Sequence, residues 1–284
     1  MASTDTPAIK ESFIDSRDGT RLRTVRWDPP ATPRGRLLFL HGWGEYSDRY
    51  RYPVADLTPK GFACFGLDCR GHGGSAGARG YISRWDDYLD DVEWWIKSLG
   101  EAEMPTYLIA HSQGGLVAAR LLETRGDQGL AGFMLSSPFL ALARPLSWIE
   151  KVMSQKLSNL WPGLKIPSGL DVNDISKDKE VVAAYEKDPL IFSKPVVRWA
   201  YEALLAQELA VENAGEISLP CLVMHGADDK IADPAVTEKL FAGLSSKDKE
   251  LKLFAGLRHE IFNEIERQDV FDLMTTWLNH RLLQ

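Results

Sequence analysis

Residues 106–115 read TYLIAHSQGG, an apolar run that ends at a serine and two glycines. The run 106–110 is typical of a buried strand, and the apolar stretch that follows predicts a helix over 113–124. A serine in a sharp turn between a strand and a helix, flanked by small residues, is the arrangement that exposes a nucleophilic hydroxyl. Ala110 and Gly114 are the small residues here, although the pattern usually has glycine at the first position. Ser112 is therefore a candidate nucleophile, and the alternative is an ordinary helix N-cap serine.

Strands and helices alternate on both sides of this stretch. Short apolar runs predict strands, and amphipathic runs predict helices, at 36–40, 50–60, 63–67, 85–99, 131–136, 221–225, 235–243, 251–254 and 269–282. Two further strands, 9–15 and 22–27, flank a turn and predict a hairpin. Buried strands that alternate with helices predict an α/β fold, with a mostly parallel sheet and helices on both faces.

Residues 138–216 break this alternation. They contain helical patterns and irregular stretches around proline and glycine, without a buried strand run. We expect a helical cap inserted into an α/β core, so that 1–137 and 217–284 form the two parts of the core. Many apolar side chains lie between Leu146 and Ile166. They either form an acyl-binding tunnel or a lipid-facing lid, or pack the cap onto the core.

Composition narrows the class of protein. The chain has 284 residues, 44% of them hydrophobic, which suits one large α/β domain with an insertion. Its net charge is −7 and no basic stripe is present, so the sequence does not support nucleic-acid binding. The first ten residues do not resemble a signal peptide, and no apolar run approaches the roughly 20 residues that span a bilayer. Three cysteines without CxxC spacing predict neither a disulfide framework nor a zinc site, and we expect a cytoplasmic protein.

A serine hydroxyl becomes a nucleophile when a histidine takes its proton and a carboxylate orients that histidine. In parallel sheets such residues lie in loops at the carboxyl ends of strands. His259 is the best candidate base among six histidines, because it follows the last expected strand. The loop after the penultimate strand holds Asp228, Asp229 and Asp233. Either Asp228 or Asp233 could cap the next helix, and spacing alone does not decide between Asp228 and Asp229.

Acyl transfer also needs N–H donors for the negative oxygen that develops on the substrate. One donor is expected from the backbone of Gln113, directly after Ser112. The other is expected from Trp43, in the glycine-rich loop HGWG at 41–44 that follows a strand. The alternative for this loop is a simple tight turn.

Five segments together resemble the monoacylglycerol lipase branch of the α/β-hydrolases, which includes lysophospholipase-like and esterase-like members. They are HGWGEYSDRY at 41–50, DCRGHGGS at 68–75, HSQGG at 111–115, GADDKIAD at 226–233 and GLRHE at 256–260. The resemblance runs from about residue 10 to the end and aligns Asp229 with the acid of the family. It implies hydrolysis of fatty-acid esters, above all monoacylglycerols, by Ser112, Asp229 and His259. No metal or organic cofactor is implied.

The chain departs from the family pattern at Ala110, at Tyr46 for histidine, at Trp43 for an often smaller residue and at Gln113 for methionine. Trp43 and Gln113 lie beside the expected acyl site, so the acyl and head-group preference stays open. A broad carboxylesterase, a lysophospholipase, a peptidase or an acyltransferase would use the same three residues, and a receptor-like binding module would use none. Dehalogenases and epoxide hydrolases use an aspartate nucleophile, so Ser112 argues against both. The expected partners are a small ester and, through the cap, a membrane or lipid droplet.

Overall fold

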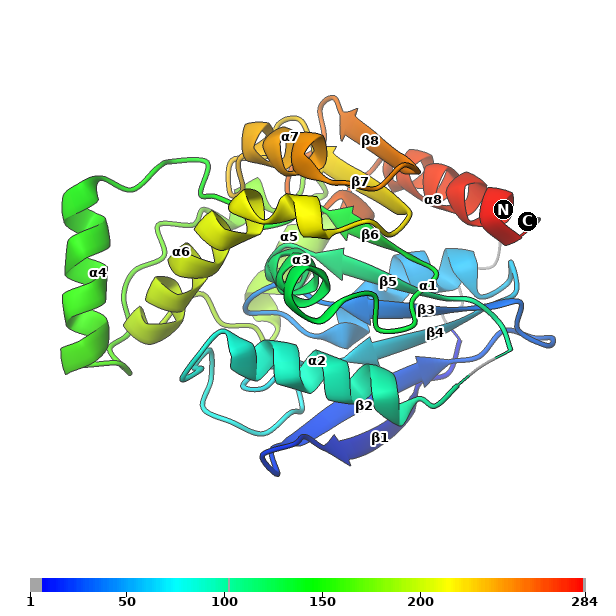
Figure 1. Cartoon of the computed structure of the whole chain (residues 1–284), viewed down its shortest axis with the longest axis horizontal. Coiled ribbons are helices and arrows are strands. Elements are labelled where there is room, and N and C mark those ends of the chain that lie inside the picture. Colours follow the sequence, from blue (N-terminus) through cyan, green and yellow to red (C-terminus); the bar gives the residue numbers. More distant parts are fainter. Residues whose placement is uncertain (1–6, 102, 283–284) are drawn as a thin grey trace.

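The computed structural model describes residues 7–101 and 103–282, in which eight strands form one sheet (Figure 1). The expectation of no signal peptide thus falls largely outside the described residues. The strands have the spatial order β1-β2-β4-β3-β5-β6-β7-β8. Their bounds are β1 (Lys10–Asp15), β2 (Arg21–Trp27), β3 (Gly35–Leu40), β4 (Phe62–Leu67), β5 (Thr106–His111), β6 (Gly132–Ser136), β7 (Cys221–Gly226) and β8 (Lys249–Phe254). The pairs β1–β2 and β2–β4 are antiparallel, and all other pairs are parallel.

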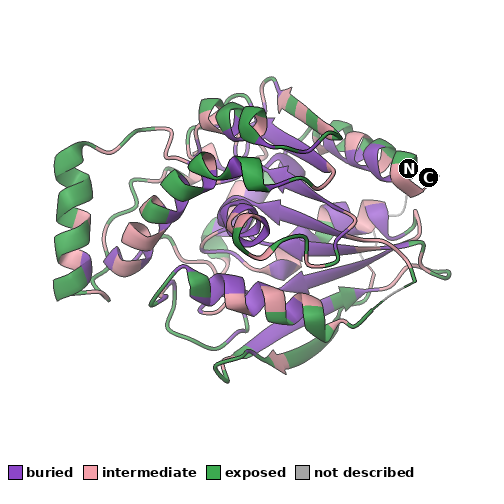
Figure 2. Cartoon of the chain, in the orientation of Figure 1, coloured by how far each residue is buried: buried purple, intermediate pink, exposed green. Residues whose placement is uncertain are grey.

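Helices cover both faces of the sheet. On one face lie α1 (Arg51–Leu57) and α8 (Arg267–Leu282), and on the other α2 (Asp86–Ser98), α3 (Gln113–Arg125) and α7 (Pro234–Gly243). Alternate residues of β5 enter the two cores, with Leu108 on the α2–α3 face and Ile109 on the α1–α8 face. A strand buried on both faces reads as an uninterrupted apolar run. Figure 2 shows the buried strands between more exposed helices, and the predicted α/β-hydrolase fold is confirmed.

The expected elements are present, and their ends differ by a few residues. Helix α1 is the clearest case, because it ends at Leu57 rather than at residue 60. The amide of Thr58 still donates to the Val54 carbonyl, and the chain then turns through Gly61, whose φ of 91° favours glycine. The amphipathic pattern runs through this turn, so the pattern alone does not locate the end of the helix.

The segment between β6 and β7 holds α4 (Trp148–Leu160), α5 (Lys179–Lys187) and α6 (Val197–Glu212), and no strand lies within 137–220. Ser147 and Glu150 form a capping box that begins α4. Figure 1 shows α4 and α6 at the end of the molecule toward which β5 and β6 point. Within the described residues, none of the helices combines the length and apolarity that a membrane span requires.

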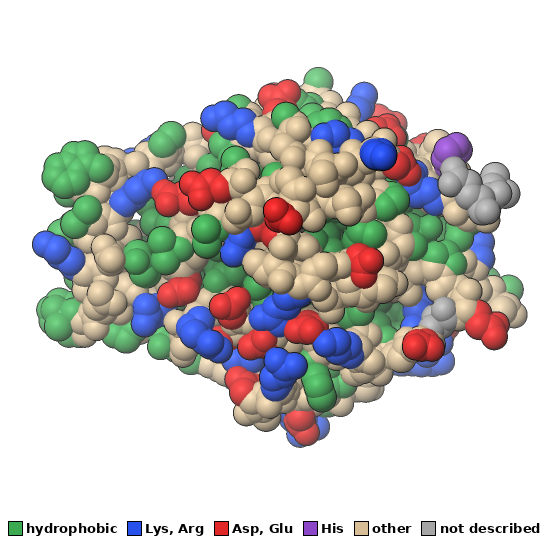
Figure 3. All heavy atoms as spheres, in the orientation of Figure 1, with side chains coloured by type: hydrophobic (Ala, Val, Ile, Leu, Met, Phe, Trp, Pro, Cys, Tyr) green, Lys and Arg blue, Asp and Glu red, His purple; other side chains and the backbone are tan. Residues whose placement is uncertain are grey.

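Helix α4 exposes apolar side chains rather than burying them. Trp148 is 73% exposed, and the other large apolar side chains exposed on or just after α4 are Ile149, Val152, Met153, Leu160, Trp161 and Leu164. Figure 3 shows hydrophobic side chains gathered at this end of the molecule. The alternative in which the apolar residues of this segment pack it onto the core therefore does not hold for these seven. We call them the exposed α4 set.

Candidate active site

Ser112 occupies a strained turn between β5 and α3. Its φ of 51° and ψ of −118° lie in a region that residues other than glycine rarely adopt. A side chain on Gly114 would place its Cβ 2.4 Å from the Leu40 carbonyl oxygen, and one on Gly115 would lie 2.8 Å from Pro138. Glycine is thus required at positions 114 and 115. Ala110 is fully buried in β5, so the departure from glycine there fits the turn.

Loops after β7 and β8 bring Asp229 and His259 to this turn. The Ser112 hydroxyl lies 2.9 Å from His259 Nε2, and His259 Nδ1 lies 2.7 Å from Asp229 Oδ2. With Nδ1 protonated, His259 donates to the carboxylate and leaves Nε2 free to accept from the serine. All three residues are buried. The structure therefore brings Ser112, Asp229 and His259 together, although Asp229 lies 117 residues and His259 lies 147 residues after Ser112 in the chain.

Asp228, Asp229 and Asp233 have separate environments. Asp228 is exposed, and Asp233 caps α7 by accepting from the amide of Ala235 at 2.9 Å. Asp229 is the buried one, and its Oδ1 accepts from the amides of Ile231 and Ala232 at 2.8 and 3.0 Å. Among these three carboxylates, only Asp229 contacts the imidazole of His259.

His225 is a second imidazole on the same carboxylate. Its Nε2 donates to Asp229 Oδ2 at 2.9 Å, and its Nδ1 accepts from the Thr237 hydroxyl at 2.9 Å. Both imidazoles therefore contact Oδ2, whereas the backbone donors contact Oδ1. The only sequence signal for it is that His225 precedes Asp229 by four residues at the end of a strand.

Electrostatics suit proton transfer from the serine. Burial alone would lower the pKa of His259, but the charge of Asp229 and its hydrogen bond raise that pKa above its ordinary value. Burial opposes ionisation of Asp229, yet the positive charge and hydrogen bonds of His259 and His225 hold its pKa well below the ordinary value. Asp229 is therefore ionised, and His259 is a stronger base than a buried imidazole without a carboxylate.

The loop 41–44 runs directly against the serine. A Cβ on Gly42 would lie 3.1 Å from the Cβ of Ser112 and 2.9 Å from Glu45 Oε1. The buried Glu45 carboxylate accepts from the Gly42 amide at 2.7 Å and from the Tyr50 hydroxyl at 3.0 Å. The backbone of Trp43 follows Gly42, and the backbone of Gln113 begins α3, so both expected donors belong to chain adjacent to Ser112.

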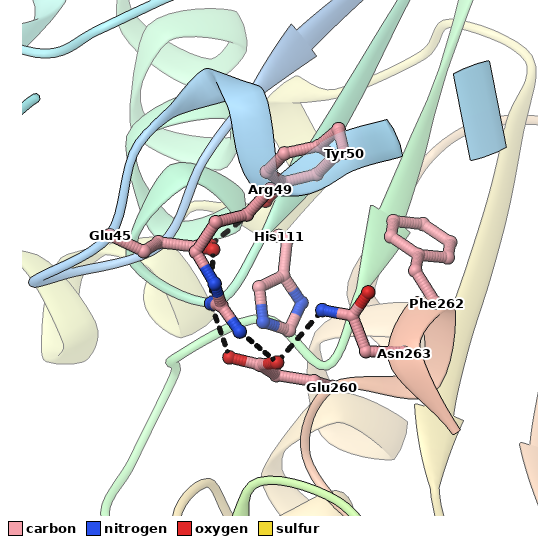
Figure 4. Close-up of a pocket in the computed structure, with 7 residues that line it drawn as sticks. All are labelled: Glu45, Arg49, Tyr50, His111, Glu260, Phe262 and Asn263. Carbon is pink, nitrogen blue, oxygen red and sulfur yellow. Dashed lines mark hydrogen bonds and ion pairs between the residues drawn. The ribbon is translucent and has the colours of Figure 1, made fainter. Parts of the chain in front are cut away.

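Charged and polar side chains line a small cavity at Glu260, the residue after His259 (Figure 4). Arg49 Nη1 lies 2.7 Å from Glu45 Oε2 and 2.6 Å from Glu260 Oε1, and its Nη2 lies 2.7 Å from Glu260 Oε2. Asn263 Nδ2 donates to Glu260 Oε2 at 2.8 Å, and the ring of His111 lies 4.9 Å from that of His259. Glu45, Arg49, His111, Glu260 and Asn263 all line a cavity of about 10 Å³, which has room for one water molecule. We call Glu45, Arg49, His111, Glu260 and Asn263 the polar side.

Aromatic side chains gather around Trp43. Its ring lies 5.0 Å from Trp199 of α6 and 5.1 Å from Phe192, and Phe139 stacks on Trp199 at 6.3 Å. Trp199 Nε1 donates to the side-chain oxygen of Gln113 at 2.7 Å. The sequence assigns Gln113 a role only through its backbone, and this side-chain contact to α6 has no local signal. We call Trp43, Phe139, Phe192 and Trp199 the aromatic side.

Within the described residues, no three histidine, cysteine or acidic side chains lie close enough together to hold a metal ion. Cys64, Cys69 and Cys221 are buried free thiols. The chemistry that the geometry offers is proton transfer from Ser112 to His259, with the Asp229 carboxylate holding the imidazole in place.

The fold and this constellation of residues define an α/β-hydrolase. The chain belongs to the family described as serine aminopeptidase S33, whose model matches residues 31–266. Phospholipase YtpA of Bacillus subtilis is 35% identical over 240 residues, which are 84% of this chain and 93% of that protein.

Solved structures place the chain within this family more closely. The monoacylglycerol lipase of Paleococcus ferrophilus superposes with a TM-score of 0.83 at 31% identity, covering 92% of this chain and 99% of that one. A soluble variant of the monoglyceride lipase of Saccharomyces cerevisiae, solved with a substrate analogue, has a TM-score of 0.85 at 26% identity, with 99% and 97% covered. The predicted resemblance is confirmed, and the protein is a carboxylic ester hydrolase of the monoacylglycerol lipase-like branch.

Proposed function

We propose that the protein hydrolyses fatty-acid esters, above all monoacylglycerols, with Ser112 as nucleophile, His259 as base and Asp229 as the acid that orients it. The observation that carries the proposal is the continuous line of hydrogen bonds from Asp229 through His259 to Ser112, at 2.7 and 2.9 Å. A hydroxyl held in this way loses its proton to the imidazole as it attacks a carbonyl.

The reaction proceeds in two halves. His259 Nε2 takes the Ser112 proton while Oγ bonds to the ester carbon, and the amides of Trp43 and Gln113 stabilise the negative oxygen. His259 then returns the proton to the alcohol oxygen, which leaves as the carbon–oxygen bond breaks. A water molecule attacks the acyl-enzyme by the same route, which releases the acid and restores Ser112.

The polar side supports an alcohol that carries further hydroxyl groups. The leaving alcohol lies toward His259, because it receives its proton from that residue. Next to the polar side, a second cavity of about 130 Å³ shares Arg49 and Asn263 with it and is also lined by Tyr46, Tyr185 and Asp188. Such donors and acceptors suit a glycerol group better than an alkyl alcohol. A lysophospholipid also carries a glycerol group, and the relative named phospholipase favours this second candidate.

Residues 138–216 act as the cap in this proposal. Helix α6 brings Trp199 to Gln113, while the exposed α4 set faces outward. Exposed apolar side chains on an amphipathic helix suit insertion into a lipid surface. We therefore propose that the cap contacts the membrane or droplet that holds the substrate.

The test compares the full chain with its Ser112→Ala variant on monobutyrin, a butyryl lysophospholipid and p-nitrophenyl butyrate. We expect turnover by the full chain, a burst of p-nitrophenol equal to the enzyme present, and a loss of at least about 10⁴-fold in the variant. Equal turnover in the variant would overturn Ser112 as nucleophile. Absence of turnover on all three esters would favour a binding module, and cleavage of only an aminoacyl anilide would favour a peptidase.

A further inference from the structure

We infer that Trp43 and Trp199 block the acyl side of the site, so that the protein prefers esters of short acyl chains. This inference rests on the proposed ester hydrolysis at Ser112 and names the substrate class of that site. It follows from where the chemistry directs the acyl chain and from which side chains occupy that direction.

The position of His259 determines where the acyl chain lies. Once Ser112 Oγ has attacked, the tetrahedral carbon carries three other groups, namely the negative oxygen, the alcohol oxygen and the acyl chain. The negative oxygen points to the backbone donors, and the alcohol oxygen points to His259 Nε2, 2.9 Å from Ser112 Oγ. The acyl chain takes the remaining direction, away from the polar side.

The aromatic side is attached to Ser112 at three points. Trp43 follows Gly42, whose Cβ would lie 3.1 Å from that of Ser112. Trp199 is tied by its indole N–H to Gln113, the residue after the serine, at 2.7 Å. The amide of Phe139 donates to the carbonyl of Ser112 itself at 2.9 Å.

The rings of the aromatic side are also in contact with one another. Trp43 lies 5.0 Å from Trp199 and 5.1 Å from Phe192, which are distances of direct ring packing. Phe192 is held in place by its amide, which donates to the Gly44 carbonyl at 3.2 Å. Trp199 is only 6% exposed. No aromatic ring of the described residues packs against both Trp43 and His259, so the two sides are separate.

A long acyl chain must therefore separate rings that are in contact. Displacing Trp43 loses its packing against Phe192 and Trp199, and displacing Trp199 also breaks its hydrogen bond to Gln113. A decanoyl group is longer than a butyryl group, so we expect it to displace more of these rings. Because pocket misfits change kcat/KM by about 10- to 200-fold, we expect decanoate to be hydrolysed about 100-fold less efficiently than butyrate.

The experiment measures kcat/KM for p-nitrophenyl esters from acetate to decanoate in the full chain and in three variants. Trp43→Ala and Trp199→Leu each remove part of the block, so each raises the decanoate-to-butyrate ratio at least about tenfold. Trp94→Leu is the matched control, because Trp94 is a 41% exposed tryptophan of α2, remote from these contacts. It leaves the ratio as in the unmodified chain, and thermal unfolding shows whether each variant is folded.

The outcomes separate this inference from the proposed function. A full chain that hydrolyses decanoate as efficiently as butyrate overturns the inference and leaves ester hydrolysis standing. The same holds if folded Trp43→Ala and Trp199→Leu both keep the ratio of the unmodified chain. A full chain that hydrolyses no ester overturns the inference together with the proposed function.

Discussion

On the polar side of Ser112 the side chains are charged and joined by hydrogen bonds, whereas on the aromatic side they are rings in contact. Arg49 connects its own segment, which holds Glu45, to the loop of Glu260, so two parts of the core are joined by one guanidinium. On the aromatic side, Trp199 comes from α6 of the inserted segment and contacts Gln113 of the core. The polar side is thus built within the core, and the aromatic side lies between the core and the inserted segment.

Under the proposed function, this difference separates two parts of substrate recognition. A buried ion pair keeps its geometry only if every charged group is paired, so the polar side presents fixed partners to a leaving alcohol. Ring packing depends on shape, so the aromatic side discriminates by the size of the acyl group. Changes on one side are therefore expected to alter one part of the substrate preference and to leave the other part in place.

The largest expected effect comes from Asp229, one of the three residues of the proposed reaction, which belongs to neither side. Asp229→Asn keeps the shape of the side chain but removes the charge that orients and stabilises the His259 imidazolium. We expect kcat/KM on p-nitrophenyl butyrate to fall by about 10⁴-fold. Asp228→Asn, at an exposed neighbour, is the matched control and keeps full activity. A small loss in Asp229→Asn would contradict the assigned acid.

The same pair of variants tests the electrostatics of His259. Only the neutral imidazole acts as base, so kcat/KM rises with pH through the pKa of His259. Because Asp229 raises that pKa, we expect the midpoint of this rise to lie above the ordinary value of 6.5. In Asp229→Asn the raising charge is absent and burial remains, so the midpoint shifts to lower pH. An unchanged midpoint would show that another group controls the profile.

Arg49→Met breaks the polar side alone. It leaves the buried Glu45 and Glu260 without their cation, and we expect the free energy of unfolding to fall by about 3–5 kcal/mol. The pKa of Glu260 is lowered chiefly by Arg49 against the effect of burial, so its stabilising contribution is present at neutral pH and is lost as the carboxyl protonates in acid. The loss on Arg49→Met therefore shrinks as the pH falls. Urea unfolding at two pH values measures both effects.

Arg144→Met is the control, since Arg144 is 77% exposed and its ion pair with Glu150 lies at the surface. We expect a change within about 0.5 kcal/mol. The separation of the two sides also predicts that folded Arg49→Met loses more kcat/KM on monobutyrin than on p-nitrophenyl butyrate and keeps its chain-length ratio. A changed chain-length ratio would show that the two sides are coupled.

The smallest expected effect on activity concerns the exposed α4 set, which belongs to neither side of Ser112. Replacing Trp148 and Leu160 with serine removes two apolar side chains from the surface that we propose to contact lipid. Since burial of such a side chain in lipid is worth about 1.5–3 kcal/mol at most, we expect activity on emulsified tributyrin to fall about tenfold. Activity on dissolved p-nitrophenyl butyrate stays the same. Equal losses on both substrates would contradict a role of α4 at a lipid surface.

Much of the fold is predictable from the sequence, because buried parallel strands read as apolar runs and their neighbours as amphipathic helices. Ser112 and His259 follow from their places in loops after strands. Spacing leaves Asp228 and Asp229 undecided, the family resemblance points to Asp229, and burial distinguishes the two carboxylates.

Other features depend on contacts between residues far apart in the chain. Arg49 and Glu260 are separated by 211 residues, and Gln113 and Trp199 by 86, so no local pattern announces either contact. The outward direction of α4 is also hidden from the sequence, because apolar periodicity marks a helix face without saying what covers it. The sequence thus predicts the reacting groups better than the two sides that select the substrate.

The most direct test is a crystal structure of the protein inhibited with ethyl p-nitrophenyl butylphosphonate, in which a serine oxygen attacks phosphorus, p-nitrophenolate leaves, and the butyl and ethoxy groups stay on phosphorus. The account predicts a bond between phosphorus and Ser112 Oγ, with the phosphoryl oxygen at the amides of Trp43 and Gln113. The butyl chain lies against the aromatic side, and the remaining alkoxy group faces His259. A butyl chain between His111 and Glu260, or phosphorus on another residue, would contradict the account.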